Sequence, residues 1–195
     1  GRFDFATSVF YNDTKDEHLQ VFDLATFQSV IENADTESYG FELEAGYQAT
    51  DAWRLEGALA LLEAEITRSN DPTVSVGNDV PFAPSLSLGL AVEYASDLTL
   101  FNKAGEFSAR AEYQYVGERQ IDPQNRDVLD SYGIVNLRFG WQHNSTQIYA
   151  FADNVFDETY AESGFVFGNS PSGDLVSIGV PGQSRRIGLG VDMTF

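Results

Sequence analysis

The side chains that could do chemistry are few in this sequence of 195 residues, and they are not grouped. There is no cysteine, and the two histidines, His18 and His143, do not have the spacing of metal ligands. Serines such as Ser177 and Ser184 have no histidine nearby and no strained G-x-S-x-G elbow. The sequence therefore predicts no catalytic residue, no metal site and no cofactor, and an enzyme is the least favoured class.

Carboxylates and arginines instead follow the spacing of β-strands. Glu42 and Glu44 are two residues apart, so on a strand both side chains point to one face. Such a face would be a hydrated acidic wall, or a surface that attracts cations near a ligand path. Arg110, Arg138 and Arg186 occupy polar positions in other alternating segments. We expect them to pair with acidic residues such as Glu93, Glu112 and Asp192, and the alternative is that they hold anionic groups of a ligand.

The composition excludes several classes of protein. Asp and Glu number 30 against 11 Lys and Arg, a formal net charge of −19, which argues against nucleic-acid binding. A hydrophobic content of 43% and an aromatic content of 13% are too high for a disordered acidic chain. No apolar run approaches the roughly 20 residues that a membrane helix needs.

Apolar and polar residues alternate with a period of two along most of the chain, which predicts strands. Most of these segments have roughly 10–12 residues, longer than the usual strand of a globular protein and close to the length that crosses a bilayer when tilted. The stretch 55–66 has a helix-favouring composition, but its place between strands makes us assign it to a strand. We expect about nine strands, at 2–11, 18–23, 39–50, 53–67, 85–95, 106–116, 132–142, 147–155 and 185–195.

Short and long connections alternate between these strands. The short ones are 12–16, 50–52 and 143–145, with 96–104 intermediate, and the long ones are 24–38, 68–84, 117–131 and 156–184. An up-and-down meander with short turns at one rim and long loops at the other has this pattern, which is typical of outer-membrane barrels. We therefore predict an all-β fold, an antiparallel up-and-down transmembrane β-barrel.

The two faces of the strands are expected to meet different surroundings. Aromatic residues lie near the ends of the apolar rows, as Phe3 and Tyr11 do, and such girdles mark the two membrane interfaces. The polar rows would line a wet lumen, whereas in a soluble β-sandwich they would be the solvated outside. The candidate lumen-facing residues are Glu42, Glu44, Glu56, Glu93, Arg110, Glu112, Arg138, Arg186 and Asp192.

Several motifs, in order along the chain, resemble those of TonB-dependent receptors of the bacterial outer membrane. Residues 151–160 resemble the F-x-x-N-L-F-D-x-x-Y stretch of that family, with Val155 in place of Leu, and 180–186 resemble its P-G-x-P-R segment, with Ser184 in place of Pro. Residues 33–44 and 9–16 resemble its N-A/Y-G-x-E-x-E and F-Y-x-x-x-K-D elements. The candidate family-motif residues are Asn154, Phe156, Asp157, Tyr160, Pro181, Gly182 and Arg185.

The resemblance implies a 22-stranded barrel closed around an N-terminal plug. Residues 1–195 would then be the C-terminal portion of the barrel, with the plug absent. It further implies a place in the outer membrane of a Gram-negative bacterium, contact with lipid and lipopolysaccharide, and energy coupling to TonB through the missing plug. The expected activity is uptake of a scarce nutrient, a ferric siderophore in the first place, with vitamin B12, haem or oligosaccharides as other possibilities.

The last strand has its own implied role. In the resemblance, an apolar-alternating strand with an aromatic end is what the barrel-assembly machinery recognises, by strand addition. The residues concerned are Ile187, Leu189, Val191, Met193 and Phe195. Two other functions stay open from the residues alone, a structural or adhesive barrel without transport and a soluble β-sandwich binding module. The sandwich predicts that the Phe, Leu and Tyr rows face each other inside and that the Glu rows face solvent.

Overall fold

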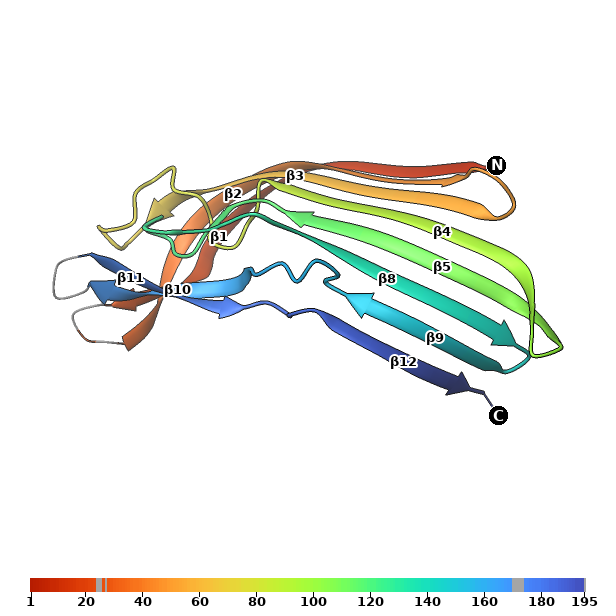
Figure 1. The fold of residues 1–195 in the computed structure, drawn as a ribbon. Coiled ribbons are helices and arrows are strands. Elements are labelled where there is room, and N and C mark those ends of the chain that lie inside the picture. The colour runs from red at the N-terminus through yellow and green to blue at the C-terminus, as the bar shows by residue number, and fades with distance from the viewer. Residues whose placement is uncertain (24–25, 27, 170–173, 195) are drawn as a thin grey trace.

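Antiparallel strands make up most of the described chain. The structure, a computed structural model, describes residues 1–23, 26, 28–169 and 174–194. Eight of its strands form one sheet in the order β1-β2-β3-β4-β5-β8-β9-β12 (Figure 1). These strands are β1 (Phe3–Asp23), β2 (Gln28–Gln48), β3 (Trp53–Ser69), β4 (Leu86–Leu100), β5 (Lys103–Val116), β8 (Tyr132–His143), β9 (Thr146–Asp153) and β12 (Arg186–Met193). The predicted all-β antiparallel fold is confirmed.

The connections are sorted by the end of the sheet at which they lie. Turns at 49–52, 101–102 and 144–145 lie at one end, together with both termini (Figure 1). The connections that follow β3, β5 and β9 lie at the other end and are long. Two of them contain a short hairpin, β6 (Arg119–Gln120) with β7 (Val128–Leu129), and β10 (Ala161–Asn169) with β11 (Leu175–Pro181). The two ends are called the short-turn end and the loop end below.

The first two predicted strands are one strand. The expected segments 2–11 and 18–23 are both parts of β1, and the expected turn at 12–16 is wrong. The pairing with β2 continues through this stretch, with a β-bulge between Thr14 and Glu17. A bulge absorbs extra residues without ending the strand, so a polar run that resembled a turn stays within the ladder.

Other connections are shorter than the sequence predicted. β2 begins at Gln28, so most of the expected loop 24–38 is strand. Likewise β4 and β5 extend into the expected connection 96–104, which leaves a two-residue turn. The count of nine strands is therefore wrong, because two merge into β1 and the hairpins inside 117–131 and 156–184 were not expected. The strand assignment of the ambiguous stretch 55–66 is confirmed by β3.

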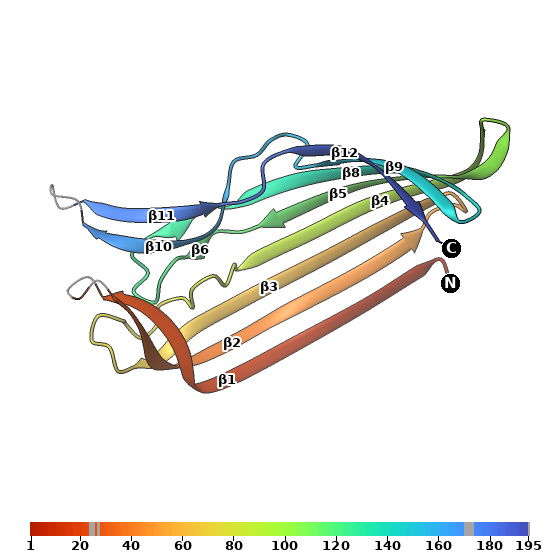
Figure 2. The ribbon, with the colours of Figure 1, turned by 90° about the horizontal axis from the view of Figure 1, so that it is seen from below.

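The register gives the two faces of the sheet opposite character. Glu93, Arg110 and Arg138 are cross-strand neighbours on β4, β5 and β8, and such neighbours share a face. The next residue along β4 and β8, Tyr94 and Phe139 respectively, lies on the opposite face. We call the face that carries Glu93, Arg110 and Arg138 the polar face, and the face that carries Tyr94 and Phe139 the apolar face. Figure 2 shows that the sheet is curved across its strands.

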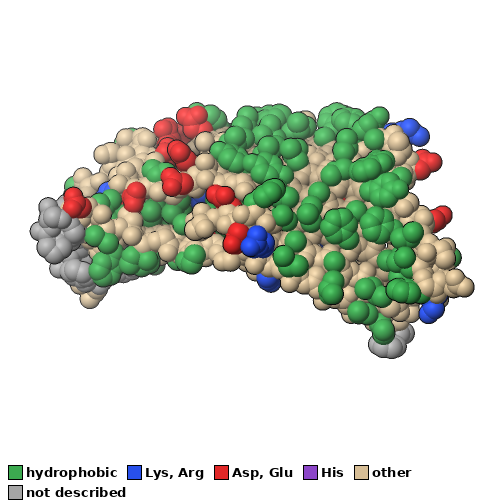
Figure 3. Space-filling view, viewed as in Figure 1, with side chains coloured by type: hydrophobic (Ala, Val, Ile, Leu, Met, Phe, Trp, Pro, Cys, Tyr) green, Lys and Arg blue, Asp and Glu red, His purple; other side chains and the backbone are tan. Residues whose placement is uncertain are grey.

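The side chains of the apolar face are exposed rather than buried. Figure 3 shows them gathered over the strands of the sheet, with few charges among them. Leaving one large apolar side chain in water forgoes roughly 1.5–3 kcal/mol of burial energy, so a face with this many requires another apolar phase. The exposed residues include Phe3, Phe5, Val9, Tyr11, Tyr39, Tyr47, Trp53, Leu55, Leu61, Leu90, Phe139, Ile148, Ile187, Leu189, Val191 and Met193.

The buried core of the described residues is small and lies toward the loop end. Leu19, Ala34, Ile66 and Val74 form its one hydrophobic cluster, with Val80 packed against it. The described strands form no second sheet over the apolar face. The soluble β-sandwich, which needs the apolar rows inside, is therefore wrong.

Glycines on the polar face of β12 lie beneath aromatic rings of β9. Gly188 is opposite Phe151 and Gly190 is opposite Tyr149 in the register. A Cβ atom added at either glycine would collide with the ring of its partner. The rings therefore lie against the neighbouring strand, in the space that a side chain on β12 would fill.

Candidate functional site

The polar face holds all nine candidate lumen-facing residues. Their positions alternate along β2, β3, β4, β5, β8 and β12, and the register connects them from strand to strand on one face. A shallow hollow of about 470 Å³ lies on this face, with Glu44, Glu56, Arg110 and Glu112 in its lining. Six of the nine candidates are carboxylates and three are arginines, so the candidates on this face carry an acidic excess.

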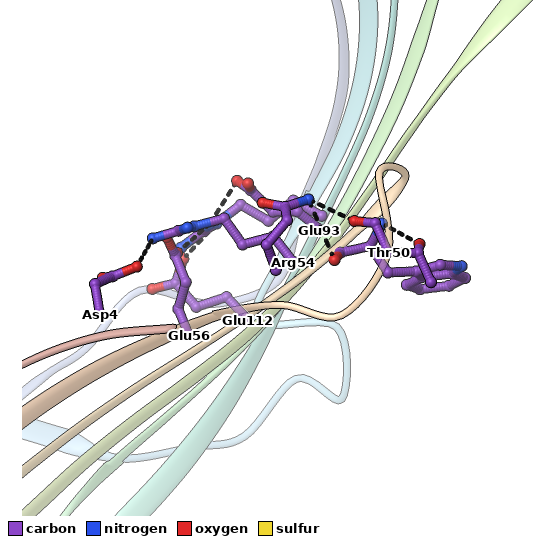
Figure 4. Close-up of polar contacts among 9 residues, drawn as sticks. Asp4, Thr50, Arg54, Glu56, Glu93 and Glu112 are labelled. Atoms are coloured by element: carbon purple, nitrogen blue, oxygen red, sulfur yellow. Dashed lines mark hydrogen bonds and ion pairs between the residues drawn. The ribbon is translucent and has the colours of Figure 1, made fainter. Parts of the chain in front are cut away.

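Arg110 brings three of the candidate carboxylates together. Its Nη1 atom donates to Glu56 Oε2 at 2.9 Å and to Glu93 Oε1 at 2.6 Å. Its Nε atom donates to Glu112 Oε2 at 3.4 Å. Figure 4 shows the side chains of Glu56, Glu93 and Glu112, which come from β3, β4 and β5. The predicted pairing of Arg110 with acidic neighbours is therefore what the structure shows.

Arg54 extends this network and was not among the candidate residues. It donates from Nε to Glu56 Oε1 at 2.9 Å, and its Nη2 lies 3.6 Å from Asp4 Oδ1 (Figure 4). The network therefore runs across β1, β3, β4 and β5. Arg54 follows the same two-residue alternation as Glu56, so the period of β3 could have identified it. Asp4 has that signal too, but the predicted meander counted 18–23 as a separate strand and so put Asp4 one strand too far from β3.

The other acidic candidates lie apart from this network. Glu42 accepts a hydrogen bond from Ser8 Oγ at 2.9 Å. Glu44 lines the hollow described above and also a second, adjoining hollow. Asp192 lies opposite Gln147 on β9, at the far end of the sheet. These three carboxylates mark the extent of the polar face rather than one site.

Arg138 and Arg186 have partners that differ from the predicted ones. Arg186 forms its ion pair with Asp153, at 2.6 Å from Nη2 to Oδ2, and not with Asp192. The guanidinium of Arg138 lies over the ring of Tyr149, 4.0 Å from its centroid. Both differences arise from register, because β12 pairs with β9, and β9 places an acidic or aromatic residue beside each arginine.

The family-motif residues come together where β9 leads into β10 and β11 leads into β12. Asn154 is buried, and its Nδ2 atom donates to the carbonyl oxygens of Glu158 at 2.8 Å and Gln183 at 3.0 Å. Its Oδ1 atom accepts from the Glu158 amide at 2.9 Å. One amide side chain thus holds the chain leaving β9 against the chain entering β12. We call this arrangement the Asn154 corner.

Further contacts of motif residues complete the Asn154 corner. Asp157 accepts a hydrogen bond from the Arg185 amide at 2.8 Å, and their side chains form an ion pair at 3.9 Å. The Gly182 amide donates to the Tyr160 carbonyl at 2.9 Å, and the Tyr160 ring fills the space that a side chain at Gly182 would need. Pro181 ends β11 beside them. Phe156 is the exception, because its side chain is 75% exposed and takes no part in the corner.

The residues implied in barrel assembly lie on the edge strand β12. Ile187, Leu189, Val191 and Met193 are all exposed on the apolar face. Phe195 lies outside the described residues. Among the residues that the structure describes, no group of three or more His, Cys, Asp or Glu side chains could hold a metal ion, and no helix is long and apolar enough to span a membrane.

Comparison with known proteins places this geometry in a family. The family model described as TonB dependent receptor-like, beta-barrel matches residues 1–155. The chain belongs to the TonB-dependent receptors. These receptors are outer-membrane proteins of Gram-negative bacteria, and the predicted family and location are confirmed. They are transporters rather than enzymes, in agreement with the predicted lack of enzymatic activity.

Two curated receptors match most of the chain, to different extents. The pesticin receptor of Yersinia pestis is 26% identical over 190 residues, which are 96% of this chain and 26% of that receptor. The metal-pseudopaline receptor CntO of Pseudomonas aeruginosa is 31% identical over 134 residues, 67% of this chain and 18% of that receptor. The chain thus spans about a quarter of the length of the first of these relatives.

Solved structures of an uptake receptor and of a transporter share the fold. The ferric yersiniabactin uptake receptor FyuA from Yersinia pestis has a TM-score of 0.79 and 24% identity, covering 100% of this chain and 28% of that one. The copper transporter OprC has a TM-score of 0.75 and 20% identity, covering 100% of this chain and 29% of that one. The curved sheet of this chain therefore corresponds to part of a receptor barrel.

Proposed function

We propose that residues 1–195 form the C-terminal part of the barrel of a receptor that imports a metal chelate, a ferric siderophore in the first place, with energy from TonB. The observation that carries this proposal is a curved antiparallel sheet of this family, with an exposed apolar face, a charged face and long connections at one end. The apolar face would contact lipid, and the polar face would line the lumen around a plug supplied by the rest of the receptor.

The choice of a metal chelate comes from the relatives. One matching structure is a receptor for ferric yersiniabactin, one relative is a receptor for metal-pseudopaline, and another structure is a copper transporter. Delivery of a metal ion, with or without an organic chelator, is common to these three names. The excess of carboxylates on the polar face favours a passage for hydrated or cationic species and gives anionic groups fewer partners than cations.

The remaining assignments belong to the same proposal. TonB would act through the plug, and lipopolysaccharide would surround the barrel above the apolar face. The barrel-assembly machinery would recognise β12 by strand addition, with the alternating residues Ile187, Leu189, Val191 and Met193 exposed toward lipid. A structural or adhesive barrel without transport is the alternative, and it predicts no dependence on TonB.

Uptake by intact cells tests the proposal. A strain that lacks the full-length receptor gene is compared with the complemented strain, each with and without TonB, for accumulation of radioactive iron from catecholate, hydroxamate and phenolate chelates. We expect at least one ferric chelate to accumulate only when both the receptor and TonB are present. Iron accumulation that is independent of the receptor for every chelate, combined with receptor-dependent copper accumulation, would overturn the choice of iron. Accumulation that needs the receptor but not TonB would overturn energised transport.

A further inference from the structure

The hairpin of β4 and β5 projects beyond its neighbours at the short-turn end. β3 begins at Trp53, opposite Tyr94, whereas the pairing of β4 with β5 continues from there to Leu100 and Lys103. The turn at 101–102 closes the hairpin, and its tip curls away from the plane of the sheet (Figure 2). We call residues 98–105 the hairpin tip.

Two side chains of β8 show the direction of this curl. Trp141 belongs to the apolar face, opposite Phe107, and its Nε1 atom donates to the Leu98 carbonyl at 3.0 Å. His143, two residues further along the same face, has its Nδ1 atom 2.6 Å from the Ala104 carbonyl oxygen. Because both partners belong to the hairpin tip, the tip lies over the apolar face. Trp141 is only 8% exposed as a result.

Gly105 allows the hairpin tip to lie this close to β8. A Cβ atom there would collide with the Trp141 indole ring and with the Gln142 carbonyl oxygen. The tip is thus fixed to β8 by one indole hydrogen bond and one imidazole contact, and Gly105 leaves the space that they need. It is a built element of the short-turn end rather than a loose turn.

The residue at the end of the hairpin tip is an aromatic in an unfavourable backbone conformation. Phe101 has φ of 52° and Asn102 has φ of 60°. Two-residue hairpin turns of this kind favour Asn-Gly or Asp-Gly, and a bulky residue at positive φ is an outlier. The Phe101 side chain is 86% exposed, so it contributes no packing within the chain. An exposed aromatic in such a position points to a partner outside the chain.

The charge of the hairpin tip also differs from that of the chain. The sequence has two lysines, Lys15 and Lys103, within a formal net charge of −19. Lys103 follows the turn directly, and no ion pair is formed by it among the described residues, whereas Lys15 is paired with Asp13 at 2.6 Å. The tip therefore carries an exposed aromatic ring and, two residues later, an ammonium group.

We propose that the hairpin tip is a membrane anchor that lies in the head-group boundary of the lipid leaflet at the short-turn end. Phe101 enters the edge of the acyl region, and Lys103 contacts lipid phosphate. Aromatic and basic side chains are the ones that anchor proteins at this boundary. Lipid is favoured over a protein partner because the tip curls onto the apolar face and is continuous with it through Leu98 and Trp141. The inference rests on the proposed contact of that face with lipid.

Spin labels in the full-length receptor test the proposal. Cysteine is introduced at Phe101, in a background without other cysteines, and the labelled receptor is reconstituted into vesicles of phosphatidylethanolamine and phosphatidylglycerol. Electron paramagnetic resonance then compares collisions of the label with oxygen, which concentrates in lipid, and with a water-soluble nickel complex. We expect oxygen to dominate at Phe101→Cys. A label at Asn102→Cys provides a second site if the first variant folds poorly.

Labels elsewhere separate the possible outcomes. Asp51→Cys lies in the fully exposed turn between β2 and β3 at the same end, and it should report water. Leu90→Cys lies on the apolar face, and it should report lipid. A label that reports lipid at Leu90 but water at Phe101 would overturn the proposed membrane anchor and leave the membrane barrel intact. A label that reports water at Leu90 would overturn the proposed contact of the apolar face with lipid, and the membrane anchor would fail together with it.

The anchoring role of Trp141 has its own variant. Trp141→Phe keeps an aromatic ring but removes the hydrogen bond to the Leu98 carbonyl. We expect the Phe101 label to become more mobile and more accessible to the nickel complex in this background. Migration on gels with and without heating shows whether the barrel has folded. A folded variant with unchanged label mobility and depth would contradict the positioning role of Trp141.

Discussion

Arg110 is the residue on which the charge network of the polar face depends. It contacts Glu56, Glu93 and Glu112, and its side chain is about one-third exposed. Partly hydrated ion pairs contribute little each, but three carboxylates left close together repel, so we expect Arg110→Gln to lower the free energy of unfolding by about 1 kcal/mol. Urea unfolding of the full-length receptor in micelles measures this change in the free energy of unfolding.

Arg138 offers a matched control for this substitution. It lies opposite Arg110 in the register but over the Tyr149 ring. Arg138→Gln removes the same charge without leaving carboxylates unpaired, so we expect less than about 0.5 kcal/mol. Equal losses from the two substitutions would show that the network adds nothing beyond the removal of one positive charge.

At the residue scale, strand periodicity identified which side chains share a face but not which of them meet. Glu93 and Arg110 were candidates, and they do form an ion pair, because their strands are consecutive. Arg186 was expected to pair with an acidic residue and does so, but its partner is Asp153, which was not among the candidates, since contacts between strands depend on register. Register is set by turn lengths and bulges, which alternation of residue types does not record.

The Asn154 corner is the element whose loss should matter most for folding. Asn154 is 2% exposed, has φ of 47° and makes three hydrogen bonds to Glu158 and Gln183. We expect Asn154→Ala to cost about 2–4 kcal/mol, because buried groups lose partners and alanine is unfavourable at positive φ. The midpoint of urea unfolding and the yield of folded receptor in membranes report the loss.

Phe156 is the control within the same motif. Its side chain is 75% exposed, so Phe156→Ala should leave the unfolding midpoint nearly unchanged. If the two variants behaved alike, the corner would not be a stabilising element. The motif was visible in the sequence, but the division between its buried asparagine and its exposed phenylalanine was not.

The part of the β1–β2 hairpin beyond the bulge is held by charge. Arg68 donates from Nε and Nη2 to Asp35 at 2.8 and 2.9 Å, outside the segment bounded by the aromatic pair of Tyr11 and Tyr39. The hydrogen bonds from Arg68, and then the one from the Asp16 amide, lower the pKa of Asp35 from 3.8 to about 2. Because the folded pKa is the lower one, the stabilisation is complete above about pH 4 and is lost as the pH falls toward about 2.

Acid should therefore loosen this hairpin. A spin label at the exposed Ile31 is expected to become more mobile between pH 4 and pH 2. In an Asp35→Asn background the label should already be mobile at pH 7 and should change little with pH. A pH response that is the same in both backgrounds would show that another group is responsible.

At the scale of elements, the sequence identified β3, β5, β8 and β12 closely and misjudged β1 and β2. Residues 12–16 are polar and contain Asn and two Asp, a composition that favours turns. The bulge between Thr14 and Glu17 keeps these residues in a strand, with Glu37 and Thr36 as partners. A strand that continues into water loses its apolar alternation, so its outer part cannot be distinguished from a loop by pattern.

For the whole molecule, the exposed apolar face predicts dependence on a membrane-like phase. We expect the 195-residue chain to show β-sheet circular dichroism in detergent micelles and to aggregate without them, because both its apolar face and its sheet edges are uncovered. A monomer that unfolds cooperatively in plain buffer would contradict the assignment of the apolar face to lipid.

The polarity of the two faces could be predicted from the sequence, and so could the sorting of short and long connections to opposite ends of the sheet. The curvature of the sheet and the curl of the β4–β5 hairpin could not. Alternation reports the polarity of each face directly. The curl depends on contacts such as that of Trp141 with Leu98, which are 43 residues apart. Long-range contacts of this kind leave no periodic trace.

The glycines of β12 have a consequence for the size of the passage. Phe151 and Tyr149 cover Gly188 and Gly190, so their rings lie against β12 rather than away from it. The guanidinium of Arg138 lies over the Tyr149 ring, so the side chains on this part of the proposed lumen are layered close to β9 and β12. An alanine at Gly190 would lift the Tyr149 ring toward the axis of the barrel. Clearance for bulky cargo on this side would then fall, although no charge had changed.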